Sequence, residues 1–190
     1  MLIAGLGNPG PEYRFTRHNL GFRAADLVAK RLSIPLNRTC WQGVSGSGMI
    51  RGRHVTILKP LTYMNLSGQS VRRALEAVGL APGDLLVIHD DMDLDFGRLR
   101  IRLRGSSGGH RGVQSIIDAL GTEEFPRLKI GVGRPPEGVD PADFVLSPFS
   151  AAEEEMVPAL LQAAADAVEA VIDSGQEAAM RRHNGLLRLE

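Results

Sequence analysis

The residue best placed for general-base chemistry is His18, which lies between a glycine-rich loop and the start of a predicted helix. Loops at strand ends are where α/β folds build their sites. An imidazole titrates near neutral pH, so it can activate water directly. A lone histidine in such a loop is more often structural than catalytic. Three polar residues in comparable positions, Asn8, Asn65 and Asp90, shift the balance toward catalysis.

Two glycine-containing motifs match known fingerprints, but their surroundings argue against both. Gly5–Gly10 has the GxGxxG spacing of a dinucleotide-binding loop. That motif needs a helix to open at the glycines, whereas Pro9 and Pro11 force an extended turn. Gly105–Gly109 has the GxSxG pattern with Ser107 as nucleophile, yet the preceding strand is half basic instead of buried and apolar. We favour a plain loop in both cases.

A third candidate for chemistry is the acidic run His89–Asp93, which follows a predicted buried strand. A histidine and carboxylates this close together are potential metal ligands. No second ligand pair at a recognisable spacing accompanies them, so we predict no metal site. The residues leave open whether these aspartates cap a turn or whether Asp90 takes part in catalysis.

The elements that must position these residues alternate between strands and helices, which is typical of a single α/β domain. No linker divides residues 1–190. The expected strands are 2–6, 85–89, 98–104 and 128–132, with a hairpin over 48–58 that turns near 51–53. The expected helices are 20–32, 67–79, 113–120 and 151–174, the last bent or begun anew near Pro158.

Composition and charge narrow the class of protein. The single cysteine, Cys40, excludes an intramolecular disulfide and suits a reducing cytoplasm. The N-terminal apolar run is too short for a signal peptide or a membrane span. Residues 1–75 carry 11 Lys/Arg and two acids, whereas residues 76–190 carry 11 Lys/Arg and 20 acids. This uneven distribution of charge either gives the protein a basic face that can bind a polyanion, or the opposite charges cancel where the two halves of the chain pack together.

Six short segments carry a family resemblance when taken together. They are GLGNPG with Tyr13 and TRHNLGF (5–22), KPLTYMNLSG (59–68), HDDMDLDFG (89–97), GGHRG (108–112), RLKIGVGRP (127–135) and DFVLSPFS (143–150). In this order and at this spacing they make the chain resemble the bacterial type of peptidyl-tRNA hydrolase. The resemblance implies an α/β fold with a mixed sheet flanked by helices, monomeric and needing no metal or cofactor. The implied activity is hydrolysis of the ester between peptide and tRNA, which recycles tRNA from prematurely released peptidyl-tRNA.

The resemblance also implies roles for individual residues. His18 is at the position of the catalytic histidine, and Asp90 at that of the acidic partner that orients it. Asn8 is at the position of an asparagine that helps to place the scissile region. The implied contacts to the 3′ end or the peptide are Tyr13, Tyr63, Asn65, His110 and Arg111. Peptidyl-tRNA is the expected partner, and neither DNA nor a membrane is expected.

A basic strand face is the best candidate for contact with the tRNA body. Arginine alternates with apolar residues through 98–104, so the arginines share one face of a strand. Such side chains hold phosphates without reading sequence. The predicted phosphate contacts are Arg98, Arg100, Arg102 and Arg104, joined by Lys129.

One residue departs from the family pattern. The family carries GGHNG where this chain has GGHRG, so Arg111 replaces an asparagine. A guanidinium has five donors and no acceptor, so it cannot repeat every hydrogen bond of a carboxamide, but it can hold a phosphate through two bonds. This departure favours the alternative of a non-catalytic RNA-binding protein on the same fold. The retained Asn8, His18, Asn65 and Asp90 favour the enzyme.

Overall fold

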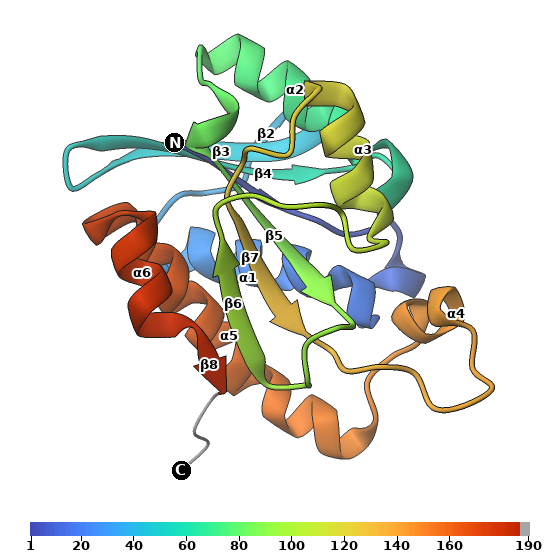
Figure 1. Ribbon diagram of the computed structural model, residues 1–190. Coiled ribbons are helices and arrows are strands. Elements are labelled where there is room, and N and C mark those ends of the chain that lie inside the picture. The colour runs from blue at the N-terminus through green and yellow to red at the C-terminus, as the bar shows by residue number, and fades with distance from the viewer. Residues whose placement is uncertain (187–190) are drawn as a thin grey trace.

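The computed structural model describes residues 1–186 of the chain. They form one mixed β-sheet whose central strands are parallel. The strands are β1 (Leu2–Gly5), β2 (Arg38–Cys40), β3 (Gly43–Ile50), β4 (Arg53–Pro60), β5 (Leu85–Asp91), β6 (Arg98–Arg102), β7 (Arg127–Gly131) and β8 (Gly185–Leu186). Their order is β2-β3-β4-β1-β5-β7-β6-β8. Strands β4, β1, β5 and β7 are parallel, and the outer pairings are antiparallel (Figure 1). The carboxyl ends of β1, β5 and β7 therefore meet at one edge of the sheet.

Helices cover both faces of this sheet (Figure 1). On one face lie α1 (Leu20–Arg31), α5 (Ala151–Ser174) and α6 (Gln176–His183). On the other lie α2 (Ser67–Val78) and α3 (Arg111–Leu120). The short helix α4 (Pro141–Leu146) and the 3-10 turns lie in the loops, the turns spanning Pro11–Tyr13, Arg17–Asn19, Met64–Leu66 and Pro82–Asp84. No helix among residues 1–186 is long and apolar enough to cross a bilayer.

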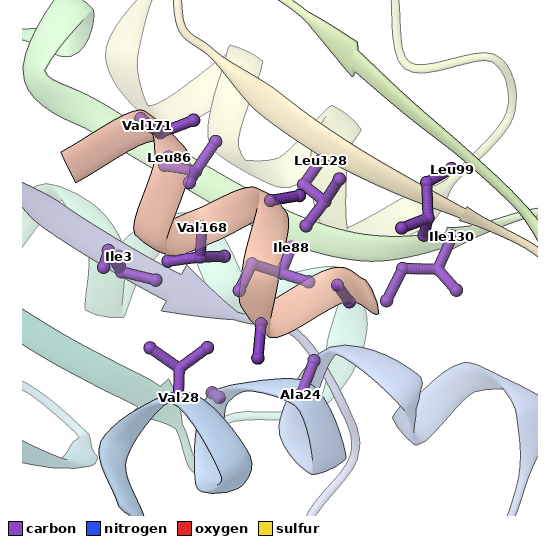
Figure 2. Close-up of a cluster of buried hydrophobic side chains, with 14 of the residues drawn as sticks. Ile3, Ala24, Val28, Leu86, Ile88, Leu99, Leu128, Ile130, Val168 and Val171 are labelled. Atoms are coloured by element: carbon purple, nitrogen blue, oxygen red, sulfur yellow. The ribbon is translucent and has the colours of Figure 1, made fainter. Parts of the chain in front are cut away.

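The larger hydrophobic cluster fills the space between the sheet and the helices α1 and α5. Ile3 and Ile88 of the central strands point toward Val28 of α1 and Val168 of α5 (Figure 2). A second cluster packs the opposite face against α2 and α3. Strand β5 is thus buried on both faces, as its continuous apolar run predicts, and burial of this kind is the main stabilising contribution to the fold.

The predicted fold class is confirmed and each predicted strand and helix is present, with boundaries that shift by a few residues. The larger differences concern the hairpin, β6 and α5. The hairpin turns at Arg51–Gly52, but β3 begins at Gly43, earlier than predicted. Strand β6 ends at Arg102, so Arg104 lies beyond it. Helix α5 runs unbroken through Pro158, so no new helix begins there.

Pro158 is tolerated because its helix is fixed on both sides of it. Ser150 and Glu153 form a capping box at the N-terminus of α5. Val157 and Leu160 flank the proline and are fully buried in the core. The packing and the cap together outweigh the hydrogen bond that proline removes.

Two glycines let α1 approach the end of β1. A side chain on Gly5 would collide with the backbone of Gly21, and one on Gly21 with the backbone of Leu6 and Ile88. The carbonyl of Leu6 accepts a hydrogen bond of 3.0 Å from the N–H of Phe22. This close contact holds the turn before α1 over the carboxyl ends of the central strands, where the predicted site lies.

Candidate active site

His18 and Asp90 meet at the carboxyl edge of the sheet. His18 lies in the 3-10 turn before α1, and Asp90 is the penultimate residue of β5. Nδ1 of His18 lies 2.9 Å and 3.0 Å from the two carboxylate oxygens of Asp90. The carboxylate only accepts, so Nδ1 carries the hydrogen. Nε2 is left as a bare acceptor with no partner among residues 1–186, and His18 lines a pocket.

The electrostatics of the pair keep the acid ionised and the histidine basic. Burial alone would raise the pKa of Asp90, but the neighbouring His18 and His110 outweigh it and hold that pKa well below its ordinary value. Burial alone would lower the pKa of His18. The charge of Asp90 and the hydrogen bond to it outweigh burial and the positive charge of Arg111, so the pKa of His18 is raised.

His110 is bonded through both ring nitrogens. Nδ1 accepts the N–H groups of Gly112 and Val113 at 3.1 Å and 3.2 Å, and Nε2 lies 3.0 Å from Oδ1 of Asp90. The predicted role of His110 in substrate binding stays a prediction. Its ring lines the pocket, but neither nitrogen is free to hydrogen-bond a substrate.

Asn8 is fixed in the glycine loop with one amide group to spare. Its Oδ1 accepts the N–H of Met64 at 2.8 Å. Its backbone N–H donates to Oδ1 of Asn19 at 2.8 Å, and the Nδ2 of Asn19 donates back to its carbonyl at 3.0 Å. The Nδ2 of Asn8 has no partner in the described part of the chain, so it remains a donor beside the pocket. Asn19 is a contributor that sequence reasoning missed.

A pocket of about 480 Å³ opens beside the His18–Asp90 pair. Its lining comes from the glycine loop, the turn at His18, and the segments 63–65, 89–92, 107–111 and 140–146. Tyr63, Asn65 and Arg111 are among the lining residues, in agreement with their predicted role. Tyr13 is not. Its 3-10 turn directs its backbone carbonyl to Thr16 (2.9 Å), and the structure does not bring its side chain to the pocket.

The residues of the acidic run His89–Asp93, at the end of β5, form hydrogen bonds and ion pairs within the protein. Lys129 holds Asp91 at 2.6 Å, and Arg134 holds Asp93 at 2.5 Å. His89 donates Nδ1–H to the carbonyl of Asp90 at 2.6 Å, and burial holds the pKa of His89 well below its ordinary value. Possible ligand atoms of His18, Asp90 and His110 lie within 4.8 Å of one another. Their hydrogen bonds account for that proximity.

Ser107 of the GxSxG match lacks the setting of a nucleophile, as expected of a plain loop. Ser107 donates its hydroxyl to Oε1 of Gln114 at 2.8 Å. The strand before it, β6, runs antiparallel to β7 and lies second from the edge of the sheet. A nucleophile elbow needs a central parallel strand instead.

Arg98, Arg100 and Arg102 lie on one face of β6 and differ in whether a carboxylate pairs with them. Leu99 and Ile101 between the arginines are buried, which confirms the alternation. Arg98 pairs with Asp95 at 3.6 Å, and Arg104 with Glu124 at 3.5 Å. Arg100 and Arg102 have no carboxylate partner among residues 1–186. Lys129 lies directly across from Arg100, as predicted, but Asp91 already neutralises its charge.

The charge difference between the two sequence halves is partly cancelled in space. Arginines of the first half form ion pairs with the acidic helix α5; the pairs are Arg17–Glu153, Arg23–Glu154, Arg31–Asp166, Arg31–Glu169 and Arg51–Asp173. Of the two alternatives that the sequence leaves open, cancellation of charge therefore holds for these side chains.

Arg17 is a second residue that sequence reasoning missed. It is buried next to His18, and its guanidinium donates to Ser147 Oγ at 2.8 Å, to the carbonyl of Pro148 at 2.5 Å and to Glu153 at 2.8 Å. It also lies 4.3 Å from the ring centre of Phe144 in α4. Arg17 thus ties the turn that carries His18 to the helix that closes one side of the pocket. A buried arginine has no signal in a single sequence until its partners are known.

Known proteins are similar to this chain in sequence and in fold. Residues 2–189 match the family model described as peptidyl-tRNA hydrolase. Peptidyl-tRNA hydrolase of Moorella thermoacetica is 51% identical over 185 residues, 97% of either chain. That of Chloroflexus aggregans is 50% identical over 186 residues, 97% of this chain and 99% of the relative. A crystal structure of peptidyl-tRNA hydrolase from Acinetobacter baumannii has a TM-score of 0.91 at 35% identity, covering 97% of this chain and 94% of that one. This chain belongs to the peptidyl-tRNA hydrolase family.

Proposed function

We propose that this chain hydrolyses the ester bond between peptide and tRNA in peptidyl-tRNA, with His18 as the general base. The contact between His18 and Asp90 carries the proposal, because it leaves Nε2 of His18 unprotonated at the wall of a pocket. Membership of the family supports the reaction.

The reaction needs only water and the groups of the site. Nε2 of His18 takes a proton from water as the water oxygen attacks the ester carbonyl. Asp90 stays ionised and stabilises the imidazolium that forms. The carbonyl carbon then loses the ribose oxygen, which receives the proton from His18. The products are a peptide with a free carboxyl group and a tRNA with a free terminal hydroxyl.

Asn8 is the proposed donor to the developing oxyanion. Its Oδ1 is occupied by the N–H of Met64, so its orientation is fixed before substrate binds. A fixed donor contributes more to the transition state than one that must reorient. Tyr63, Asn65 and Arg111 are the proposed contacts for the 3′ end or the peptide, and Arg100 and Arg102 for phosphates of the tRNA body.

One experiment separates the enzyme from the alternative of a non-catalytic RNA-binding protein. The purified chain is mixed with N-acetyl-aminoacyl-tRNA and with the same tRNA carrying a free amino acid. We expect release of the N-acetyl amino acid and little release of the free amino acid. Stable binding without release of either would reject the enzyme. The predicted monomer and cytoplasmic location remain predictions, and the first is checked by the mass of the chain in solution.

A further inference from the structure

The two nitrogens of His110 have different partners, and these partners fix its tautomer. Nδ1 caps helix α3 by accepting the N–H groups of Gly112 and Val113. A ring nitrogen that accepts two N–H groups carries no hydrogen itself. The hydrogen of the neutral ring is therefore on Nε2, which faces Oδ1 of Asp90 at 3.0 Å and donates to it.

We propose that His110 is a positioning residue, held by helix α3 as a permanent hydrogen-bond donor to the carboxylate that orients His18. The inference rests on the proposed function, because it presupposes that Asp90 orients the general base. It also gives His110 a role other than the substrate contact predicted from the sequence.

His18 and His110 contact the same oxygen of Asp90, so the bond from His110 can affect His18. Oδ1 of Asp90 lies 2.9 Å from Nδ1 of His18 and 3.0 Å from Nε2 of His110. Two donors from different elements hold the carboxylate in one orientation, and a fixed carboxylate holds the imidazole that it accepts from. With Nδ1 engaged as an acceptor by helix α3, the ring presents its donor at Nε2 to Asp90.

The hydrogen bond from His110 also moderates the basicity of His18. A carboxylate whose charge is partly engaged by one donor attracts a second donor less strongly. The groups that face His18 are Asp90 of β5, His110 at the N-cap of α3, and Arg111 of α3. The groups that face His110 are His18 at 4.8 Å between ring centres, His89 at 4.6 Å, and Asp90. Loss of the donor at position 110 should therefore raise the pKa of His18.

Two substitutions separate the two bonds of His110. In His110→Asn the amide oxygen can take the place of Nδ1 and cap α3, but the side chain is too short to reach Asp90. In His110→Gln the amide nitrogen can take the place of Nε2 and donate to Asp90, while the cap is lost. We expect His110→Asn to unfold at nearly the original temperature but to lose roughly tenfold in kcat, the low end for a hydrogen bond to a charged group.

The pH dependence of kcat/KM is the readout that a merely structural role would not move. We expect the acid limb of His110→Asn to shift to higher pH. His110→Gln should keep the original limb and most of kcat, although it unfolds at a lower temperature. The proposal is overturned if His110→Asn retains both kcat and the original limb, or if the wild-type ¹⁵N spectrum shows the hydrogen of His110 on Nδ1. The spectrum decides the matter even if His110→Gln does not fold.

A direct titration of His18 by NMR keeps this inference apart from the proposed function. If the acid limb of the wild-type chain does not follow the titration of His18, the general-base assignment fails. If the limb follows His18 and His110→Asn moves neither, only the role of His110 fails.

Discussion

Nδ1 of His18 lies 2.9 Å from Oδ1 of Asp90, although 72 positions separate the two residues in the chain. Strands β1 and β5 are parallel neighbours, so their carboxyl ends deliver both residues to the same edge of the sheet. The close contact between Gly5 and Gly21 holds the turn that contains His18 at this edge of the sheet. Sheet topology thus brings His18 and Asp90 together, and substitutions at these two residues test their proposed roles.

Replacement of His18 should remove turnover and leave tRNA binding nearly intact. We expect His18→Ala to lower kcat by about 10²–10⁴, the usual contribution of a general base. Its affinity for tRNA should hold, since the arginines of β6 are untouched. Single-turnover release of N-acetyl amino acid and filter binding measure the two quantities. His54→Ala, at an exposed histidine of β4, is the matched control. Activity of His18→Ala close to wild type would reject His18 as the base.

The acid limb of kcat/KM reports the proton that His18 must lose before it acts. Because Asp90 raises the pKa of His18, we expect the limb of the wild-type chain to lie above the ordinary histidine value of about 6.5. Activity should fall as pH drops through it. In Asp90→Asn the burial and the charge of Arg111 remain, and both lower the pKa, so the limb should move below that value.

The same variant should also lose turnover at every pH. An amide at position 90 can donate to Nδ1 of His18, which would leave the hydrogen on Nε2 and block the base. We expect a loss of about 10²–10⁴ in kcat. A limb that stays in place in Asp90→Asn would show that Asp90 does not set the basicity of His18.

Local patterns in the sequence predict most of the strands and helices of the fold. The apolar run 85–89 predicts a strand buried on both faces, and the arginine alternation predicts a strand with one basic face; the structure has both. The choice of His18 as the general base is predicted only with the help of the family resemblance. A single histidine in a loop has the same local signature whether or not a carboxylate meets it in space.

The parts that the sequence could not predict depend on contacts between distant segments. The acids of α5 cancel the arginines of residues 17–51 because α1 and the β3–β4 hairpin pack beside that helix. Lys129, a predicted phosphate contact, pairs with Asp91 at 2.6 Å because β5 and β7 are neighbouring strands. The cap that orients His110 requires knowledge of where α3 begins relative to β5.

Arg100 and Arg102 of β6, which have no carboxylate partner in the described part of the chain, should govern the salt dependence of tRNA binding. Each phosphate contact contributes about one unit to the slope of log affinity against log salt concentration. We expect Arg100→Ala and Arg102→Ala each to weaken binding and to flatten the slope by up to about one. Arg72→Ala removes an equal charge from α2, where Glu76 pairs with it at 2.7 Å, and should leave the slope unchanged. An unaltered slope in both β6 variants would exclude these contacts.

Arg111 should bind a phosphate near the 3′ end, since it lines the pocket, is exposed, and has no ion-pair partner among residues 1–186. Arg111→Asn restores the family residue and removes the charge. We expect it to raise KM about tenfold for N-acetyl-aminoacyl-CCA, the loss typical of one charged hydrogen bond. The matching adenosine ester, which carries no phosphate, should be cleaved with unchanged KM. Arg111→Lys keeps the charge but not the two-pronged geometry, so it should fall between.

The comparison of the two substrates also detects the other places where the guanidinium could act. An equal loss on both substrates would mean that Arg111 contacts the peptide or the ester instead of a phosphate. The charge of Arg111 lowers the pKa of His18, so Arg111→Asn should in addition move the acid limb to higher pH on either substrate. A KM effect confined to the phosphate-bearing substrate, together with a limb that moves on both, would show that one arginine serves binding and basicity through separate interactions.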